Sequence, residues 1–535
     1  MRHENLWIDT DPSGLVWTGL DCDDDLAILI ALAIAKNSKN SSLTNNDSNL
    51  TSTAGSTVSF REKEEDESSL STATSTRALN LSLAGISVCG GNAPLAHTWD
   101  DIHALWDYID FETYDLSTII RPVKGYGWNA MQISRPWLKF LNLLSPDIDD
   151  SNDAVEAIVN AITIDDELPL PSNTEQSRNT ELTILTLGPP TNVAKSIATI
   201  QWRAEQGVEQ SSYNSDTTHR RNMFNNLKHV YMMGGELTGQ RLDLNFMTDR
   251  GAARTIIEAS DVPVTLIPIQ LCGQVIVTKD FVERFETDCC CPSRSSSIMN
   301  DGGSTAEGGA SYSSGSSSSP YAPAAACAIL PKMKQQVTLM PNFVNKAVAN
   351  KFPIFDKVKS SGKEEILTSD HARRQLWTPS PNLKNGFIPW DVVALLVVTH
   401  PELFDNFEYH RVEFPGCDEG EPCDGTMSIL EDFGRSLPTS SSILDFNGNS
   451  VGAFNHSGIV RIPHTIKNET LVLETMHQLL CQVPAKGPST SSNSLGIEHI
   501  TLSTHPPRIM WGFLSPILGT ILVVISAVAV CKCRS

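Results

Sequence analysis

Leu6-Trp7-Ile8-Asp9-Thr10-Asp11-Pro12, near the start of the chain, is a short apolar run that ends in two carboxylates. Ten residues after Asp11, Asp21-Cys22-Asp23-Asp24-Asp25 leads directly into the apolar run Leu26-Ala27-Ile28-Leu29-Ile30-Ala31. The first stretch predicts a buried strand, and the second predicts the start of a buried helix. The sequence therefore predicts that six aspartates converge where the first strand ends and the first helix begins.

The same alternation of short apolar runs and helical patterns recurs further along the chain. Strand-like runs lie at 83–88, 182–187, 230–233 and 264–269, and helix-like patterns at 26–35, around 104 and at 193–200. This order predicts an α/β fold with a mostly parallel central sheet that is flanked by helices on both faces. Ligands of such sheets bind at the carboxyl ends of the strands, which is where the aspartates stand.

A cluster of buried carboxylates repels itself unless a hard cation neutralises it, and oxygen ligands suit calcium or magnesium. Two other interpretations of the aspartates remain open at this point. One is a solvated acidic loop with an aspartate that caps the helix. The other is a magnesium-dependent phosphatase of the haloacid dehalogenase type, in which the first aspartate of an Asp-x-Asp run is the nucleophile.

The aspartate run resembles the signature of the inosine-uridine-preferring nucleoside hydrolase family. That signature is Asp-x-Asp-Pro-Gly with a following Asp-Asp pair, and the matching residues are Asp9, Asp11, Pro12, Asp23 and Asp24. Residues 14–19 depart from it as a short insertion. The resemblance continues in order to about residue 480, through segments 85–92, 185–192, 232–235, 243–245 and 388–392.

The resemblance implies a set of site residues around one Ca²⁺ ion. The metal ligands are Asp11, Asp24, Asp391 and the carbonyl of Leu187, and Asp11 is also the general base for the attacking water. The ribose is bound by a further set, with Gln240 where an asparagine is usual: Asp23, Asn92, Gln240, Asp243 and Asn245. Asn192 is not included, because an asparagine at this position also closes a turn or begins a helix.

Trp390 precedes the metal aspartate at a position where the pyrimidine-processing members of the family carry a histidine acid. An indole cannot donate a catalytic proton at neutral pH, but its face stacks on a purine. Trp390 therefore resembles the purine-specific members, with Trp128 or Trp137 as a second stacking partner, unless Trp390 only fills the core. The expected activity is hydrolysis of the N-glycosidic bond of ribonucleosides, most of all purine ribonucleosides. The alternatives are a non-catalytic, membrane-attached nucleoside-binding protein and the phosphatase described above.

The catalytic domain is expected to cover residues 1–485, with low-complexity, disordered insertions near 38–76, 172–180, 206–222 and 293–319. A linker at 486–508 would lead to a transmembrane helix at 509–530 and a short tail at 531–535. The 22 residues from Ile509 to Val530 carry no charge. As a helix they span about 33 Å, against a hydrocarbon core of about 30 Å.

The orientation of this single-pass C-terminal anchor is left open by two opposing features. Lys532 and Arg534 favour a cytoplasmic tail. The sequence beginning at Met1, however, has no apolar signal segment, which places the catalytic domain in the cytosol unless the N-terminus is truncated.

The composition argues against nucleic-acid binding and against a fold held together by many disulfides. With 535 residues and a formal net charge of -22, the chain repels phosphate backbones, which disfavours nucleic-acid binding. Twelve cysteines are too sparse for a disulfide scaffold, although Cys417 and Cys423 can pair if the domain is lumenal. The family resemblance also allows a homo-oligomer.

Overall fold

The computed structural model describes residues 3–12, 22–47, 80–109, 121–127, 150–163, 181–210, 224, 226–237, 243–259, 262–290, 325–338, 386–414, 427–436 and 458–483. The chain divides into a unit of residues 1–486 and a second unit of residues 487–535. All described residues belong to the first unit. The expected linker, transmembrane helix and tail lie outside the described residues, as do Cys417 and Cys423.

Nine strands of the described part form one sheet, in the order β10-β9-β11-β6-β5-β4-β1-β2-β3. Their bounds are β1 His3–Thr10, β2 Asn80–Val88, β3 Val123–Lys124, β4 Leu182–Thr186, β5 Leu227–Met233, β6 Val264–Ile267, β9 Phe404–Glu413, β10 Ser428–Gly434 and β11 Ile459–Ile466. The strands from β11 to β3 are parallel to one another, whereas β9 is antiparallel to both β10 and β11. A separate antiparallel pair joins β7 Val277–Thr278 to β8 Gly386–Phe387.

The helices connect these strands. They are α1 Asp23–Asp47, α2 Leu95–Tyr108, α5 Asp153–Ile162, α6 Thr191–Gln210, α8 Leu244–Thr248, α9 Arg250–Ala259, α10 Ile269–Cys272, α11 Lys279–Phe285, α15 Trp390–Thr399 and α16 Glu469–Cys481. Short π and 3-10 turns cover Glu286–Cys290, Ala325–Ala328 and Pro401–Leu403.

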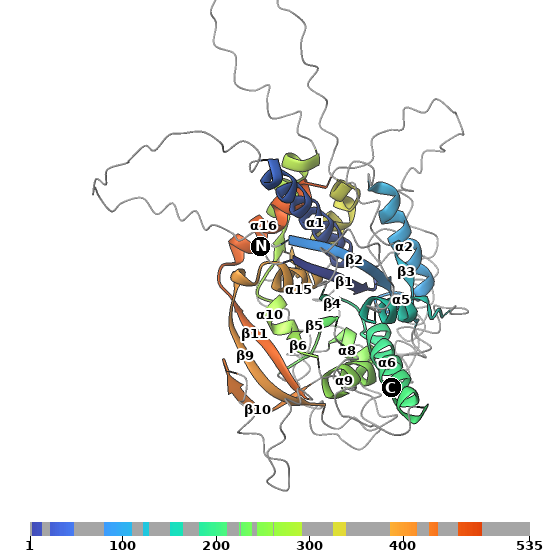
Figure 1. Cartoon of the computed structure of the whole chain (residues 1–535). Coiled ribbons are helices and arrows are strands. Elements are labelled where there is room, and N and C mark those ends of the chain that lie inside the picture. The colour runs from blue at the N-terminus through green and yellow to red at the C-terminus, as the bar shows by residue number, and fades with distance from the viewer. Residues whose placement is uncertain are drawn as a thin grey trace, which may run out of the picture. The chain divides into compact units, whose positions relative to one another are not determined.

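The alternation of side chains along the strands divides the core into two clusters. On β1, Leu6 and Ile8 pack into the cluster that contains α1 and α15, while Trp7 packs into the cluster that contains α5, α6 and α9. On β4, Leu185 and Ile184 divide in the same way. The central strands therefore lie between two groups of helices, as Figure 1 shows. The predicted mostly parallel sheet flanked by helices is confirmed.

Two helices extend into segments that were expected to be loops. Helix α1 continues through Asp47, so the insertion expected near 38–76 begins as helix, because neither glycine nor proline interrupts residues 38–47. Ser38 accepts a hydrogen bond from the amide of Leu81 at 3.0 Å, which ties this part of α1 to β2. Helix α6 likewise runs through Gln210, into the segment expected near 206–222. The segments at 172–180 and 293–319 lie outside the described residues.

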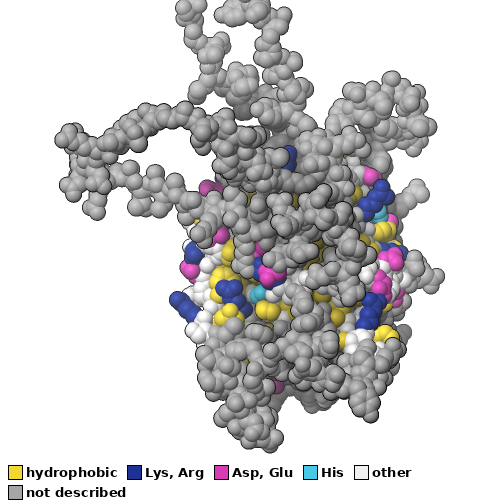
Figure 2. All heavy atoms as spheres, viewed as in Figure 1, with side chains coloured by type: hydrophobic (Ala, Val, Ile, Leu, Met, Phe, Trp, Pro, Cys, Tyr) yellow, Lys and Arg dark blue, Asp and Glu magenta, His cyan; other side chains and the backbone are white. Residues whose placement is uncertain are grey.

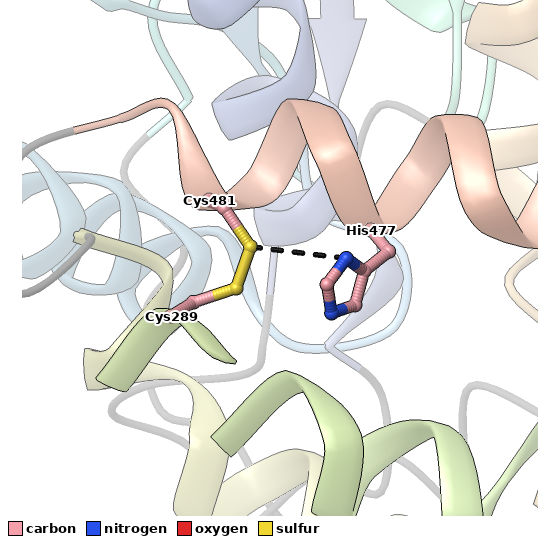
Figure 3. A group of neighbouring side chains, drawn as sticks. All are labelled: Cys289, His477 and Cys481. Carbon is pink, nitrogen blue, oxygen red and sulfur yellow. Dashed lines mark hydrogen bonds between the residues drawn. A yellow bond between two sulfur atoms is a disulfide. The ribbon is translucent and has the colours of Figure 1, made fainter. Parts of the chain in front are cut away.

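Four cysteines that the sequence analysis left unpaired form two disulfides. Cys289 pairs with Cys481, which ends α16, and Cys290 pairs with Cys327. Figure 3 shows the first disulfide with His477 of α16 beside Cys481. The partners are separated by 192 and 37 residues, so nothing in their spacing along the sequence pointed to these pairs.

Within the described part of the chain, no helix has both the length and the apolar character needed to cross a membrane. Figure 2 shows basic and acidic side chains interspersed over the described part of the face in view. That part of the face therefore presents no patch of a single charge.

Candidate active site

Three buried carboxylates from two helices meet next to the end of β1. Asp23 and Asp24 stand in the first turn of α1, and Asp391 stands in the first turn of α15. Their side chains are 1%, 1% and 4% exposed, and each offers an oxygen within 4.8 Å of the others. We call Asp23, Asp24 and Asp391 the carboxylate cluster.

The packing of α1 against α15 brings this cluster together. Residues 26–34 of α1 and residues 392–398 of α15 are apolar and buried, and both segments belong to the same core cluster. The backbone amide of Asp391 donates a hydrogen bond to Oδ2 of Asp23 at 3.2 Å, which fixes the start of α15 against the start of α1. Residues that are 368 positions apart in the sequence thus share one site.

Asp11 lies directly after β1 and is connected to the cluster through its backbone. Its amide donates to Oδ1 of Asp24 at 3.2 Å, and Oδ1 of Asp24 also accepts a short hydrogen bond from the hydroxyl of Thr10. The carboxylate of Asp11 accepts the amide of Asn92 at 2.6 Å through Oδ2. Asp11 therefore lies beside the cluster, with its carboxylate held by the loop that follows β2.

Two glycines leave the space that the Asp11 carboxylate occupies. A Cβ atom at Gly91 would collide with Oδ2 of Asp11, and a Cβ atom at Gly188 would collide with Oδ1. Gly91 follows β2, and Gly188 follows β4, the two strands that flank β1 in the sheet. The ends of three neighbouring strands therefore determine the position of this one carboxylate.

Asp9 is buried beneath the residues of the site. The sequence analysis did not assign it a role there. Its side chain is fully buried and accepts hydrogen bonds through Oδ1 from Ser87 at 2.6 Å and from Asn192 at 2.8 Å. Burial raises the pKa of Asp9 to about 7, while these two hydrogen bonds oppose the rise. Ser87 and Asn192 are 78 and 183 positions away in the sequence, so no local pattern pointed to this role.

The side chain of Asn192 makes hydrogen bonds that connect parts of the chain around the site. Besides donating to Asp9, its side chain accepts the amide of Tyr126 at 3.0 Å. Asn192 thereby links α6 to β1 and to the loop after β3.

Leu187 and Asn245, which were expected to bind the metal and the ribose, are in direct contact. The side-chain amide of Asn245 donates to the carbonyl of Leu187 at 2.5 Å and to the carbonyl of Met233 at 3.2 Å. One residue of α8 thus joins the ends of β4 and β5. The Leu187 carbonyl has two lone pairs, so this bond leaves it able to accept a second contact.

Asp243 caps the N-terminus of α8. Its carboxylate accepts the backbone amides of Asn245 and Phe246 within the helix and that of Gly235 at 2.6 Å. Burial raises the pKa of Asp243 to about 7, although the three amides oppose the rise. The nearby charge of Glu236 adds to the rise in the pKa of Asp243. Asp243, which was expected to bind the ribose, thus caps a helix in the structure.

The remaining expected residues are placed only in part. Asn92 is half-buried next to Asp11, and Trp390 begins α15 as a partly buried side chain packed against the core. Gln240, Trp128 and Trp137 lie outside the described residues.

The donor set of the carboxylate cluster fits a hard divalent cation. Three negative charges within 4.8 Å of one another and shielded from water are costly unless a positive charge neutralises them. All three offer oxygen, which calcium and magnesium prefer. The group contains Asp24 and Asp391, which were expected to bind the metal, and Asp23, which was expected to bind the ribose; Asp11 lies beside it.

Comparisons with known proteins give matches among solved structures. No protein-family model and no curated protein sequence matches the chain. A plant nucleoside hydrolase is 13% identical over 89% of this chain and 99% of its own, with a TM-score of 0.43. A purine-preferring ribonucleoside hydrolase from Gardnerella vaginalis is 13% identical over 90% and 99%, with a TM-score of 0.42. An inosine-uridine-preferring nucleoside hydrolase from Bacillus anthracis is 10% identical over 90% and 100%, with a TM-score of 0.40.

Proposed function

We propose that this chain hydrolyses the N-glycosidic bond of ribonucleosides, with purine ribonucleosides as its preferred substrates, and releases free base and ribose. The observation that carries the proposal is the meeting of Asp23, Asp24 and Asp391 in one buried cluster beside Asp11. The cluster supports a metal-assisted hydrolysis. The choice of ribonucleosides rests on the motifs that resemble the nucleoside hydrolase family.

Asp24, Asp391 and Asp11, with the carbonyl of Leu187, would hold the cation, for which we propose Ca²⁺. When bound, such an ion orients a water molecule and lowers its pKa. Asp11 takes the proton from the water, and the Asn92 amide on its Oδ2 fixes the direction of the carboxylate during this step. The side chains of Asp23, Asn92, Asp243 and Asn245, together with Gln240, bind the ribose hydroxyls.

Trp390 and Trp128 would bind the base by stacking. Trp390 adjoins Asp391 at the start of α15, so the proposed base-binding and metal-binding residues are consecutive. A planar purine offers a larger face for stacking than a pyrimidine. This difference is the physical basis of the proposed preference.

The hydrogen bonds of Asp9 disfavour the phosphatase alternative. Asp9 is the first aspartate of the Asp-x-Asp run and would have to act as the nucleophile. Its Oδ1 accepts hydrogen bonds from Ser87 and Asn192, which fix the carboxylate and make that oxygen a weaker nucleophile. Phosphate release from a phosphomonoester would nevertheless identify that reaction.

We also propose that residues 509–530 attach the chain to a membrane as a single C-terminal span. The support is their uncharged composition and length. Homo-oligomer formation stays a prediction of the family resemblance.

Reducing-sugar release by the purified full chain tests the proposed activity. Inosine, guanosine, adenosine, uridine and cytidine are compared, each with and without a chelator and with Ca²⁺ or Mg²⁺ restored. We expect the purine nucleosides to react fastest, chelation to abolish turnover and Ca²⁺ to restore it. Equal rates for inosine and uridine would contradict the purine preference, and nucleoside binding without ribose release would show a binding protein instead.

A further inference from the structure

Two histidines and a glutamate converge at the edge of the sheet, away from the candidate active site. His410 and Glu408 lie on β9, and His464 lies on the neighbouring strand β11. One donor atom from each of the three lies within 4.8 Å of the others. In the sheet, β11 is separated from β1 by β6, β5 and β4, or by about 19 Å at about 4.8 Å per strand. The group is therefore distinct from the carboxylate cluster.

The strand pairing explains why these side chains share a face. Glu408 is opposite Ile462, and His410 is opposite Val460. Directly opposite residues of an antiparallel pair point to the same side, and Ile462 and Val460 both belong to the core cluster of α5, α6 and α9. His464 is two positions beyond Ile462 on β11 and so points the same way.

The distances between the donor atoms match those of a tetrahedral metal site. The two Nε2 atoms are 3.0 Å apart, and Oε2 of Glu408 lies 3.5 Å from Nε2 of His464 and 3.9 Å from Nε2 of His410. Zinc binds imidazole nitrogen and carboxylate oxygen at about 2.0–2.1 Å, which places tetrahedral ligands about 3.3 Å apart. The three separations lie on both sides of this value, and the two rings stand at 85° to each other.

Residues around His410 and His464 favour the ring tautomer and the strand position that a metal would need. On the opposite side of the His410 ring, Nδ1 lies 3.5 Å from Oδ1 of Asp432 on β10. Nδ1 makes no hydrogen bond to this carboxylate, but the negative charge favours the tautomer with its proton on Nδ1, which leaves the lone pair of Nε2 for a metal. Gln274 donates to the carbonyl of His464 at 2.8 Å and accepts the amide of Ile466 at 3.1 Å, which holds β11 in place.

We infer that Glu408, His410 and His464 form a zinc site, with the charge of Asp432 acting on Nδ1 of His410. The site links β9 to β11 directly and reaches β10 through Asp432, so it joins three strands at the edge of the sheet. His464 and Glu408 are 30% and 32% exposed, which gives the ion a route from solvent. Three protein ligands leave one position for water, as in zinc sites that are not fully closed.

Zinc binding by the oxidised full chain tests this site. The protein is titrated with Zn²⁺ against a chromophoric chelator, in millimolar Ca²⁺ so that the carboxylate cluster is saturated. We expect one equivalent of tightly bound zinc for the wild type and for His103→Gln, a control that removes an exposed histidine on α2. His464→Gln and Glu408→Gln are each expected to lose that equivalent, and Asp432→Asn to weaken binding about 10–100-fold.

His464 and Glu408 are partly exposed, so His464→Gln and Glu408→Gln remove a metal ligand without leaving a cavity in the core. Circular dichroism of each variant checks that it is folded. Zinc is also expected to raise the Tm of the wild type and of His103→Gln but not that of His464→Gln. Absence of tight zinc binding by the wild type, or equal stoichiometry in folded His464→Gln, would overturn the inference. Either result is independent of nucleoside turnover.

Discussion

At the scale of single residues, the position of Asp11 depends on two neighbouring glycines, which have no Cβ atom. Gly91 and Gly188 face its two carboxylate oxygens, and the amide of Asn92 binds Oδ2. A carboxylate that acts as a general base must be held within a few tenths of an ångström of its productive position. Glycine is required at both positions because any Cβ atom would occupy the space of the carboxylate.

Replacing Gly188 with alanine should therefore impair turnover without removing any proposed functional group. Its Cβ would displace Oδ1 of Asp11, and a shift of about 1 Å in such a group costs about 10²-fold. We expect kcat to fall by about this factor for Gly188→Ala. Gly434→Ala is the matched control, because a Cβ there meets nothing within 4 Å, although its φ of 62° makes a modest loss of stability expected. Equal kcat values for the two variants would contradict the proposed role of this contact.

Asp11 itself is expected to act in proton transfer. Asp11→Asn keeps the size of the side chain and an oxygen for the Asn92 amide, but it removes the base. General-base assistance contributes about 10²–10⁴-fold, so we expect kcat to fall within this range. The exposed Asp100→Asn on α2 serves as the control and should keep wild-type turnover. Turnover by Asp11→Asn within threefold of the wild type would assign the base to another residue.

At the scale of secondary-structure elements, the site is built from the ends of strands and the first turns of helices. Asp23 and Asp24 begin α1, Asp391 begins α15, and Asp243 caps α8. Helix N-termini favour negative charge because their backbone amides are unpaired and the helix dipole is positive there. The fold thus supplies part of the compensation for carboxylates that it removes from water.

The cap at α8 leads to a pH dependence of stability. The folded-state pKa of Asp243, at about 7, exceeds its ordinary value of 3.8. Between these values the folded protein retains a proton that the unfolded chain has released, so this group's contribution to stability is complete below about pH 4 and is lost as the pH rises through 7. The difference corresponds to about 4 kcal/mol as an upper limit, at about 1.4 kcal/mol for each pKa unit.

Asp243→Asn should remove this loss, because an amide does not ionise. Its oxygen can still accept the amides of Gly235 and Phe246, whereas the NH2 group cannot accept the amide of Asn245, so the variant is expected to be less stable than the wild type at low pH. We expect the free energy of unfolding, from denaturant titrations in chelator between pH 4.5 and 7.5, to fall less for Asp243→Asn than for the wild type. Asp100→Asn should follow the wild type at every pH. Parallel curves for Asp243→Asn and the wild type would show that Asp243 is charged at no cost in the folded protein.

The elements and the polar residues that follow them were largely predictable from the sequence. Apolar runs bounded by aspartate, glycine and asparagine placed β1, β2, β4, β5 and β6, and their carboxyl ends placed Asp11, Asn92 and Leu187 together. The continuation of α1 to Asp47 was not predicted, because polar serines and asparagines carry no helical periodicity although nothing stops the helix. The roles of Asp9 and of the Asn245 contact with Leu187 depend on tertiary contacts between distant residues, which no local pattern encodes.

At the scale of the whole molecule, two disulfides connect segments that are distant in sequence. Cys481, at the end of α16, pairs with Cys289, and the adjacent Cys290 pairs with Cys327. Disulfides are common in secreted and lumenal proteins and rare in the cytosol. They indicate that the described part of the chain folds in an oxidising compartment. The sequence analysis had left the compartment open.

Mass spectrometry of the purified full chain tests the disulfides and the compartment together. The chain is alkylated under denaturing conditions without reductant, and we expect linked peptides joining Cys289 to Cys481 and Cys290 to Cys327. Cys89 and Cys272 are buried and in no disulfide, so both should be alkylated and serve as internal controls. Reduction should lower the free energy of unfolding by about 2–5 kcal/mol, because each crosslink restricts the unfolded chain. Complete alkylation of Cys289 and Cys481 in protein isolated from its native source without reductant would contradict this pairing and indicate a reducing compartment.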